Sequence, residues 1–257
     1  NQTLKLFDFE DVTKNDFVVT NQFTVTNANG TIIPDITIFV NGIPLVVVEC
    51  KSPKLAPSKQ LTEAYKQMDR YLRVNERLFW YNQILILTSR DRAKTATLFT
   101  PAKHYNVWKD PYPLTLGEVG SDYPQDILVA GMLRKEALMD LINNFIVFDG
   151  KAKKLARYQQ YRAVNKTLDR ILEGKKPSLR GGVVWHTQGS GKSLTMVYLA
   201  KKLRRIPKLK NPMVVIVTDR TDLDDQITKT FRDCGFSSPY RANSVEDLKF
   251  QLSKGQG

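Results

Sequence analysis

The chain contains little cysteine and no long hydrophobic segment. Only Cys50 and Cys234 occur among its 257 residues, too few for a disulfide framework, so we expect a reducing, cytoplasmic environment. No apolar run approaches the ~18 residues that a membrane-spanning helix needs, and no signal-peptide pattern opens the chain. These absences exclude disulfide-stapled proteins and predict that no membrane is involved.

Acidic residues are outnumbered by basic ones. The 39 Lys and Arg residues exceed the 26 Asp and Glu residues, which gives a formal charge of +13. Such an excess attracts polyanions, and it suits double-stranded DNA better than a small acidic substrate. A merely soluble basic protein has the same composition, so the charge alone does not establish DNA binding.

The length allows two modest domains, each with its own core. A turn at Asp149-Gly150 followed by lysines predicts the boundary, so we expect domains over residues 1–150 and 151–257. β-branched and aromatic runs predict strands in the first domain, and apolar spacing predicts its helices. The strands are expected at Phe17–Thr26, Pro34–Val40, Pro44–Cys50 and Gln83–Thr88, and the helices at Leu61–Val74, Pro124–Leu133 and Lys135–Phe145.

Helices and strands alternate in the second domain, which predicts a parallel sheet with helical crossovers. The expected helices are Tyr158–Leu172, Lys192–Leu203 and Asp222–Cys234, and the expected strands are Gly182–Trp185 and Met213–Thr218. Because residue 1 is not methionine, we expect both ends to be edges of a longer protein.

A glycine-rich turn precedes the expected helix at Lys192. In this turn Gly189, Ser190 and Gly191 can direct backbone N–H groups at a phosphate, and the helix N-terminus adds its dipole. Lys192 is expected to reach the β- and γ-phosphates of ATP, and the Ser193 hydroxyl is expected to hold Mg²⁺. The sequence therefore predicts a nucleotide-binding P-loop, although His186 stands where the general pattern has glycine.

Three charged residues interrupt otherwise apolar strands. Asp35 and Glu49 can supply carboxylate oxygens to Mg²⁺, which a phosphodiester hydrolase uses to activate water. Lys51, two residues after Glu49 on a strand, points to the same face and can stabilise the transition state. Burying such charges is costly unless they pair or bind metal. A buried ion pair between Lys51 and Glu49 is the alternative interpretation.

The Asn41-Gly42 hairpin must be irregular for the two carboxylates to share a metal. A plain two-residue turn sets Asp35 opposite Val48, so that Asp35 and Glu49 lie on opposite faces of the sheet. A three-residue loop or a β-bulge shifts the register by one and sets Asp35 beside Glu49. We therefore predict an irregular hairpin.

These patterns together resemble a known family. Pro34-Asp35 and Glu49-Cys50-Lys51 resemble the PD-(D/E)xK nucleases. Nearly all of the chain is similar to the R subunit of type I restriction enzymes, and the Gln67–Tyr71 segment resembles an additional motif of that family. The resemblance implies that ATP hydrolysis needs an acidic motif and an arginine finger beyond residue 257. The resemblance implies a mixed nuclease sheet flanked by helices, followed by a truncated RecA-like P-loop domain. It also implies catalytic roles for Gln67 and Tyr71.

A second resemblance concerns the nucleotide base. The segment from Arg157 to Ala163 is similar to the glutamine motif of superfamily 2 helicases, which implies that Gln160 presents its amide to adenine. Gln159 is its nearest rival.

The resemblance to R subunits implies ATP-driven translocation on duplex DNA and Mg²⁺-dependent cleavage away from the recognition site. It further implies assembly with separate methylation and specificity subunits. Two alternatives stay open: a stand-alone helicase–nuclease of DNA repair, and a non-catalytic DNA-binding or assembly module.

Overall fold

The computed structural model describes residues 4–236 and 239–254. It divides into two compact units, residues 1–146 with 153–159, and residues 147–152 with 160–257. The division passes close to Gly150, where a turn joins strands β8 (Ile146–Asp149) and β9 (Ala152–Leu155). No helix of the described ranges is long and apolar enough to cross a lipid bilayer.

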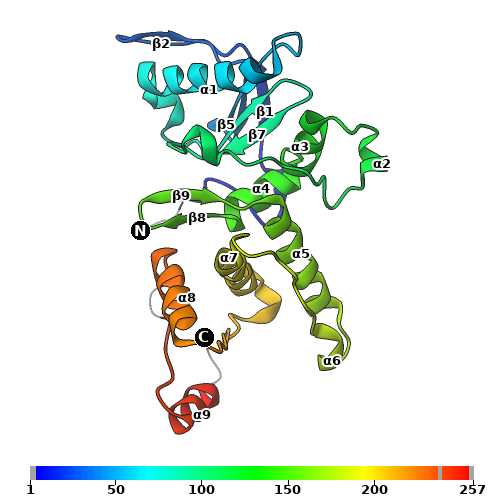
Figure 1. Ribbon diagram of the computed structural model, residues 1–257, viewed down its shortest axis with the longest axis vertical. Helices are drawn as coiled ribbons and strands as arrows, with labels where there is room; N and C mark the ends of the chain where they lie inside the picture. The colour runs from blue at the N-terminus through cyan, green and yellow to red at the C-terminus, as the bar shows by residue number, and fades with distance from the viewer. Residues whose placement is uncertain (1–3, 237–238, 255–257) are drawn as a thin grey trace. The chain divides into compact units, whose positions relative to one another are not determined.

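The first unit is built on a five-stranded mixed sheet (Figure 1). Parallel strands β5 and β6 lie at its centre, and the other neighbours pair antiparallel. Helix α1 (Pro57–Val74) connects β5 to β6, which is the crossover that parallel neighbours require. The mixed sheet flanked by helices is therefore as predicted. In spatial order its strands are β1 (Phe17–Asn21), β4 (Ile36–Val40), β5 (Ile43–Cys50), β6 (Ile84–Thr88) and β7 (Ala93–Ala96).

Both faces of the central strands are covered. All five residues of β6 are buried, and β5 is buried from Leu45 to Glu49. Helix α1 turns Ala64, Met68 and Tyr71 onto this sheet, at the spacing of one helix face. Burial on both faces explains why these strands read as nearly continuous apolar runs.

The predicted strand Phe17–Thr26 is wrong in its second half. Strand β1 ends at Asn21, and Gln22 adopts a left-handed φ of 49°, which breaks the extended run. The chain then continues as β2 (Val25–Asn27), which pairs with β3 (Gly30–Ile32) in a separate hairpin. The remaining elements of this unit are η1 (Val12–Lys14), η2 (Glu76–Phe79), η3 (Ala102–His104), α2 (Leu116–Val119), α3 (Pro124–Met132) and α4 (Lys135–Asn144).

The β4–β5 hairpin is irregular, as predicted. Its turn is the plain two-residue one, with Asn41 at φ 50° and Gly42 at φ 78°, and the first pair is Val40 with Ile43. The register then shifts between Ile38 and Phe39. Continued past the last pair, the shifted register sets Asp35 beside Glu49.

The extra residue of this bulge is Leu45. Phe39 pairs with Pro44, whereas Ile38 pairs with Val46. A β-bulge therefore makes the shift, and the alternative of a three-residue loop is wrong.

The second unit is mostly helical in the described residues. Its helices are α5 (Tyr158–Glu173), which begins in the first unit, α6 (Pro177–Arg180), α7 (Lys192–Arg205), η4 (Pro207–Leu209), α8 (Thr221–Asp233) and α9 (Val245–Ser253). Helices α7 and α8 bury Val197, Tyr198, Ile227 and Phe231. Three of these helices lie within two residues of their predicted bounds, because amphipathic spacing is a local property of the chain.

The parallel sheet predicted for the second unit is not formed by the described residues. Neither Gly182–Trp185 nor Met213–Thr218 is a strand, and Trp185 and Val217 are each 89% exposed. A strand needs a neighbour to pair its N–H and C=O groups, and these two segments have none in the part of the chain described. A RecA-like fold thus remains a prediction.

The hairpin turn generates a first prediction. Gly42→Ala should destabilise the chain by about 1 kcal/mol, because a Cβ is strained at positive φ, although no neighbouring atom would meet it. Gly117→Ala in α2 is the control, since Gly117 has no positive φ. Urea unfolding of both variants checks this; equal losses would contradict it.

Candidate functional sites

The first candidate site lies where β5 ends. Glu49, the last buried residue of β5, is fully buried, and Lys51 follows the strand end. Asp35 immediately precedes β4, and its Oδ2 accepts a hydrogen bond from the Cys50 N–H at 2.7 Å. The β-bulge thus ties the Asp35 carboxylate to the backbone beside Glu49.

Helix α1 completes this cluster through a chain of hydrogen bonds. The Lys51 Nζ donates to Glu49 Oε1 and to Gln67 Oε1, both at 2.5 Å. Gln67 Nε2 donates to the Tyr71 hydroxyl at 2.6 Å, and this hydroxyl donates to the Ile33 carbonyl at 2.9 Å. The chain runs from the lysine to the segment that carries Asp35. All five residues predicted for this site are therefore brought together.

The electrostatics of the cluster are dominated by burial of Glu49. Burial raises the pKa of this carboxyl to about 7, the Lys51 ammonium opposes the rise, and the negative Asp35 adds to it. Burial also raises the pKa of the Tyr71 hydroxyl to about 12. Tyr71 therefore stays protonated and continues to donate its hydrogen bond.

One oxygen of Glu49 is left without a partner. Its Oε2 is buried and has no hydrogen-bond donor among the residues described. The nearby Tyr71 hydroxyl, which donates to the Ile33 carbonyl, lowers the pKa of the Glu49 carboxyl through a weaker interaction. Buried acceptors are rarely left unpaired, so such an atom calls for a cation, a water or a proton.

The donor set fits a hard divalent cation. Glu49 Oε2 and the Asp35 carboxylate are the oxygen ligands that Mg²⁺ prefers, with waters or phosphate oxygens filling other positions. No group of three or more His, Cys, Asp or Glu side chains in the described ranges could hold a metal by itself. A cation here would thus depend on non-protein ligands, as Mg²⁺ at phosphate sites usually does.

Gln60 supports the same cluster, although no motif predicts this role. Gln60 is buried, donates from Nε2 to the carbonyls of Pro53 and Leu55, and accepts from the Ser89 hydroxyl at 2.6 Å. These bonds fasten the loop that leads from Lys51 into α1. Its position could have indicated this role, because Gln60 is a polar residue four positions before Ala64, on the otherwise apolar face of the helix.

The second candidate site is the glycine-rich turn before α7. Gly189 and Gly191 have φ values of 74° and 85°, and α7 starts at Lys192, with Ser193 in its first turn. The Ser190 hydroxyl donates to the Thr187 carbonyl at 2.7 Å. This is the turn-to-helix geometry that the sequence predicts, although the predicted preceding strand is missing.

Two side chains hold this turn. Lys192 Nζ folds back to the carbonyls of His186 and Thr187 at 3.0 and 3.1 Å. Gln160 is buried, and its Nε2 donates to the Gly191 carbonyl at 2.9 Å. In this arrangement the Gln160 amide nitrogen contacts the turn, whereas the resemblance implied a contact with adenine.

Comparison with known proteins identifies matches over most of the chain. Residues 1–104 match the family described as type I restriction enzyme R protein N terminus, and residues 159–257 match the SWI2/SNF2 ATPase family. The type I restriction enzyme HindI endonuclease subunit of Haemophilus influenzae is 38% identical over 99% of this chain and 25% of its own length.

A second relative, from Methanocaldococcus jannaschii, is provisionally named the type I restriction enzyme MjaIXP endonuclease subunit. It is 35% identical over 99% of this chain and 26% of its own length. The chain thus spans about a quarter of the length of the curated relatives it matches.

The burial of Glu49 predicts a cost in stability. Because the folded-state pKa is raised from 4.5 to about 7, the folded protein binds a proton that the unfolded chain has released between these pH values. The stability of the metal-free protein should therefore fall as the pH rises from about 4.5 to 7.

Glu49→Gln removes this cost. In EDTA at pH 8 the variant should melt at least about 2 °C above the wild type, and the difference should vanish as the pH falls toward 4.5. Scanning calorimetry at several pH values measures it. A lower melting temperature for the variant at pH 8 would show that the Lys51 pair outweighs the desolvation of Glu49.

The glycine-rich turn predicts unequal effects at its two glycines. A Cβ at Gly191 would lie 2.7 Å from Gln160 Nε2, whereas one at Gly189 would meet nothing within 4 Å. Both glycines have positive φ, so Gly189→Ala is a matched control for backbone strain. Gly191→Ala should lower the melting temperature further than Gly189→Ala, and adding Gln160→Ala should narrow the gap. Equal losses at both glycines would refute the close contact.

Proposed function

This chain belongs to the family of type I restriction enzyme R proteins, and we propose on that premise that its first unit cleaves duplex DNA with Mg²⁺. The observation that carries the proposal is the unpartnered, buried Oε2 of Glu49 beside Asp35 and Lys51. A carboxylate that is costly to bury is retained where it holds a metal at a catalytic site.

Each residue of the cluster has a distinct part in this proposal. Asp35 and Glu49 would hold Mg²⁺, which when bound activates water and neutralises charge on the phosphate. Lys51 would stabilise the charge that develops at the phosphate. Gln67 orients Lys51, and Tyr71 anchors Gln67 to the segment that carries Asp35.

We further propose that the second unit binds ATP. The backbone N–H groups of Gly189, Ser190 and Gly191 would surround the phosphates at the start of α7. Lys192 would exchange its two carbonyl contacts for the β- and γ-phosphates, and Ser193 would hold Mg²⁺. Gln160 would support the turn from below the phosphates, through its bond to Gly191.

At the level of the whole protein, we propose ATP-driven translocation on DNA with cleavage away from the recognition site. The name of the Haemophilus influenzae relative, a type I restriction enzyme endonuclease subunit, supports this assignment. Methylation and specificity subunits are the proposed partners. A stand-alone helicase–nuclease would share the chemistry but not these partners, so co-purification with a methylation–specificity complex discriminates between the two.

Removal of a metal-binding carboxylate should abolish cleavage. Asp35→Ala and Glu49→Ala should each reduce Mg²⁺-dependent nicking of supercoiled plasmid at least about 100-fold, with DNA binding retained. Asp91→Ala, at an exposed acidic position of the same unit, is the control and should cleave normally. Retained nicking by either site variant would favour the non-catalytic alternative.

Lys192→Ala should separate the two activities. Removing its ammonium should abolish binding of a fluorescent ATP analogue, because that charge supplies the main side-chain contact to the phosphates. Plasmid nicking should persist, since the proposed metal site belongs to the other unit. If both activities were lost while circular dichroism showed an intact fold, the two-site model would be wrong.

A further inference from the structure

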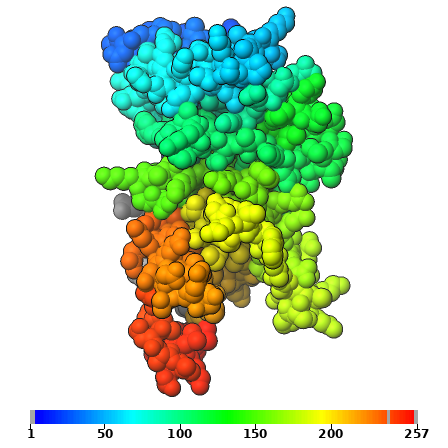
Figure 2. Space-filling view, in the orientation of Figure 1, coloured from blue at the N-terminus to red at the C-terminus, as the bar shows by residue number. Residues whose placement is uncertain are grey.

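Helix α1 presents a row of cations to solvent. Lys59, Lys66, Arg70 and Arg73 are all exposed, and their spacing of seven, four and three residues sets them along one side of the helix. The residues that α1 buries, centred on Met68, face the sheet instead. Residues 57–77, light blue to cyan, form part of the visible face of the first unit (Figure 2).

This basic row (Lys59, Lys66, Arg70 and Arg73) flanks the metal-binding cluster. Gln67 follows Lys66 directly and reaches inward to Lys51, so the row lies on the solvent side of the residue that orients the catalytic lysine. Fourteen residues of helix extend about 21 Å. That length corresponds to about six base pairs of duplex DNA.

Two acidic residues pair with the row, and both side chains are partly exposed. Glu63 pairs with Lys66 at 3.0 Å, and Asp69 pairs with Arg73. Exposed pairs of this kind contribute little free energy, so a phosphate can replace either carboxylate. Lys59 has no ion pair in the part of the chain described, and Arg70 makes only a 3.4 Å bond to the Thr31 carbonyl.

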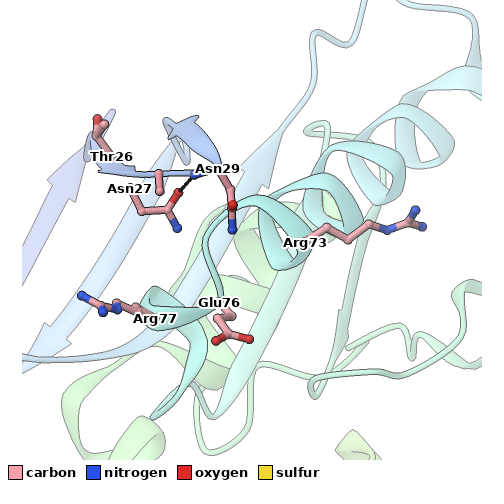
Figure 3. A pocket seen from close by; sticks show the side chains of 7 residues that line it. Thr26, Asn27, Asn29, Arg73, Glu76 and Arg77 are labelled. Carbon is pink, nitrogen blue, oxygen red and sulfur yellow. Dashed lines mark hydrogen bonds between the residues drawn. The ribbon is translucent and has the colours of Figure 1, made fainter.

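The row ends at a hollow of about 550 Å³ beside the β2–β3 hairpin (Figure 3). Asn27, Asn29, Arg73 and Arg77 line it together with Glu76. Figure 3 shows Arg73 and Arg77 pointing to opposite sides rather than converging, with the Glu76 carboxylate between them. The hollow is therefore unsuited to enclose a phosphate, and the open helix face is the better contact surface.

We propose that this basic row binds the phosphate backbone of the DNA duplex whose scissile phosphate enters the Asp35–Glu49–Lys51 cluster. The inference rests on the proposed nuclease function and adds the surface that positions the substrate. Its occupant is identified by charge complementarity, because a rigid polyanion matches a row of cations that extends about 21 Å along the helix. Contacts of this kind position the duplex without reading its sequence.

The test neutralises the row without touching the catalytic cluster. A Lys59→Gln, Lys66→Gln and Arg70→Gln triple variant is compared with the wild type and with a control triple at Lys5, Lys103 and Lys109. All six lysines and arginines are exposed, so both triples remove three charges from the surface. Binding of a fluorescent random 30-base-pair duplex is titrated between 50 and 200 mM salt in EDTA.

The row variant should lose at least tenfold in affinity at 100 mM salt. Its slope of log K against log salt should be shallower by about 2.7, because each of the three lost phosphate contacts contributes about 0.9. The control triple should change the slope by less than 1. Equal changes in both triples would overturn the proposal, because they would show that only net charge matters.

Plasmid cleavage in Mg²⁺ separates this inference from the nuclease function. If the wild type cleaves and the row variant binds and cleaves equally well, the proposed DNA-binding role of the row is refuted and the nuclease function is supported. If the wild type fails to cleave but the row variant still loses affinity for DNA while the control triple does not, the DNA-binding role of the row is supported and the nuclease function is refuted. If the row variant binds DNA normally but no longer co-purifies with methylation and specificity subunits, the DNA-binding proposal is overturned and the row is a protein interface.

Discussion

The contact between Lys51 and Glu49 is the interaction on which the first unit's chemistry depends. A carboxylate with no exposed surface at the end of β5 is costly in the absence of a counter-charge. Lys51 supplies that charge at 2.5 Å and is itself held by Gln67. Because Lys51 contacts only one oxygen of Glu49, the other remains available to a cation. An ion pair that neutralised both oxygens would leave no place for metal.

The bulge at Leu45 is the geometric condition for this arrangement. Side chains alternate between the faces of a sheet, so a one-residue slip moves a whole set to the other side. Without the slip Asp35 would face away from Glu49. With it, the Asp35 carboxylate accepts a hydrogen bond from the Cys50 N–H, and its negative charge raises the pKa of Glu49. The tight turn at Asn41-Gly42 and the bulge thus have separate effects, since one reverses the chain and the other sets the register.

Helix α1 contributes both to the core of the first unit and to its candidate site. The helix buries Ala64, Met68 and Tyr71 against the sheet, and the same packing brings Gln67 to Lys51. Gln60 fixes the loop at the helix start through two carbonyls. The helix therefore contributes packing on one face, positioning on its flank and a basic row on its outer face. Any change in its rotation about its own axis would alter all three together.

The amino-acid sequence by itself determined the local features of this protein. Amphipathic spacing specified α1, α5, α7 and α8. Motif spacing pointed to Asp35, Glu49, Lys51 and the glycine-rich turn, whereas the family resemblance pointed to Gln67 and Tyr71. These features depend on residues a few positions apart, which is where helix periodicity and turn chemistry act. The same motifs carry the resemblance to the R subunits of type I restriction enzymes, which the matches to known proteins support.

Tertiary structure decided what depends on partners distant in the chain. It chose the bulge over a longer loop, ended β1 at Asn21, and set the Gln160 amide against Gly191. It also left Gly182–Trp185 and Met213–Thr218 without the strand pairing that their apolar runs suggested. Strand pairing and buried side-chain contacts join residues far apart in sequence, so their outcome is set by packing rather than by local preference.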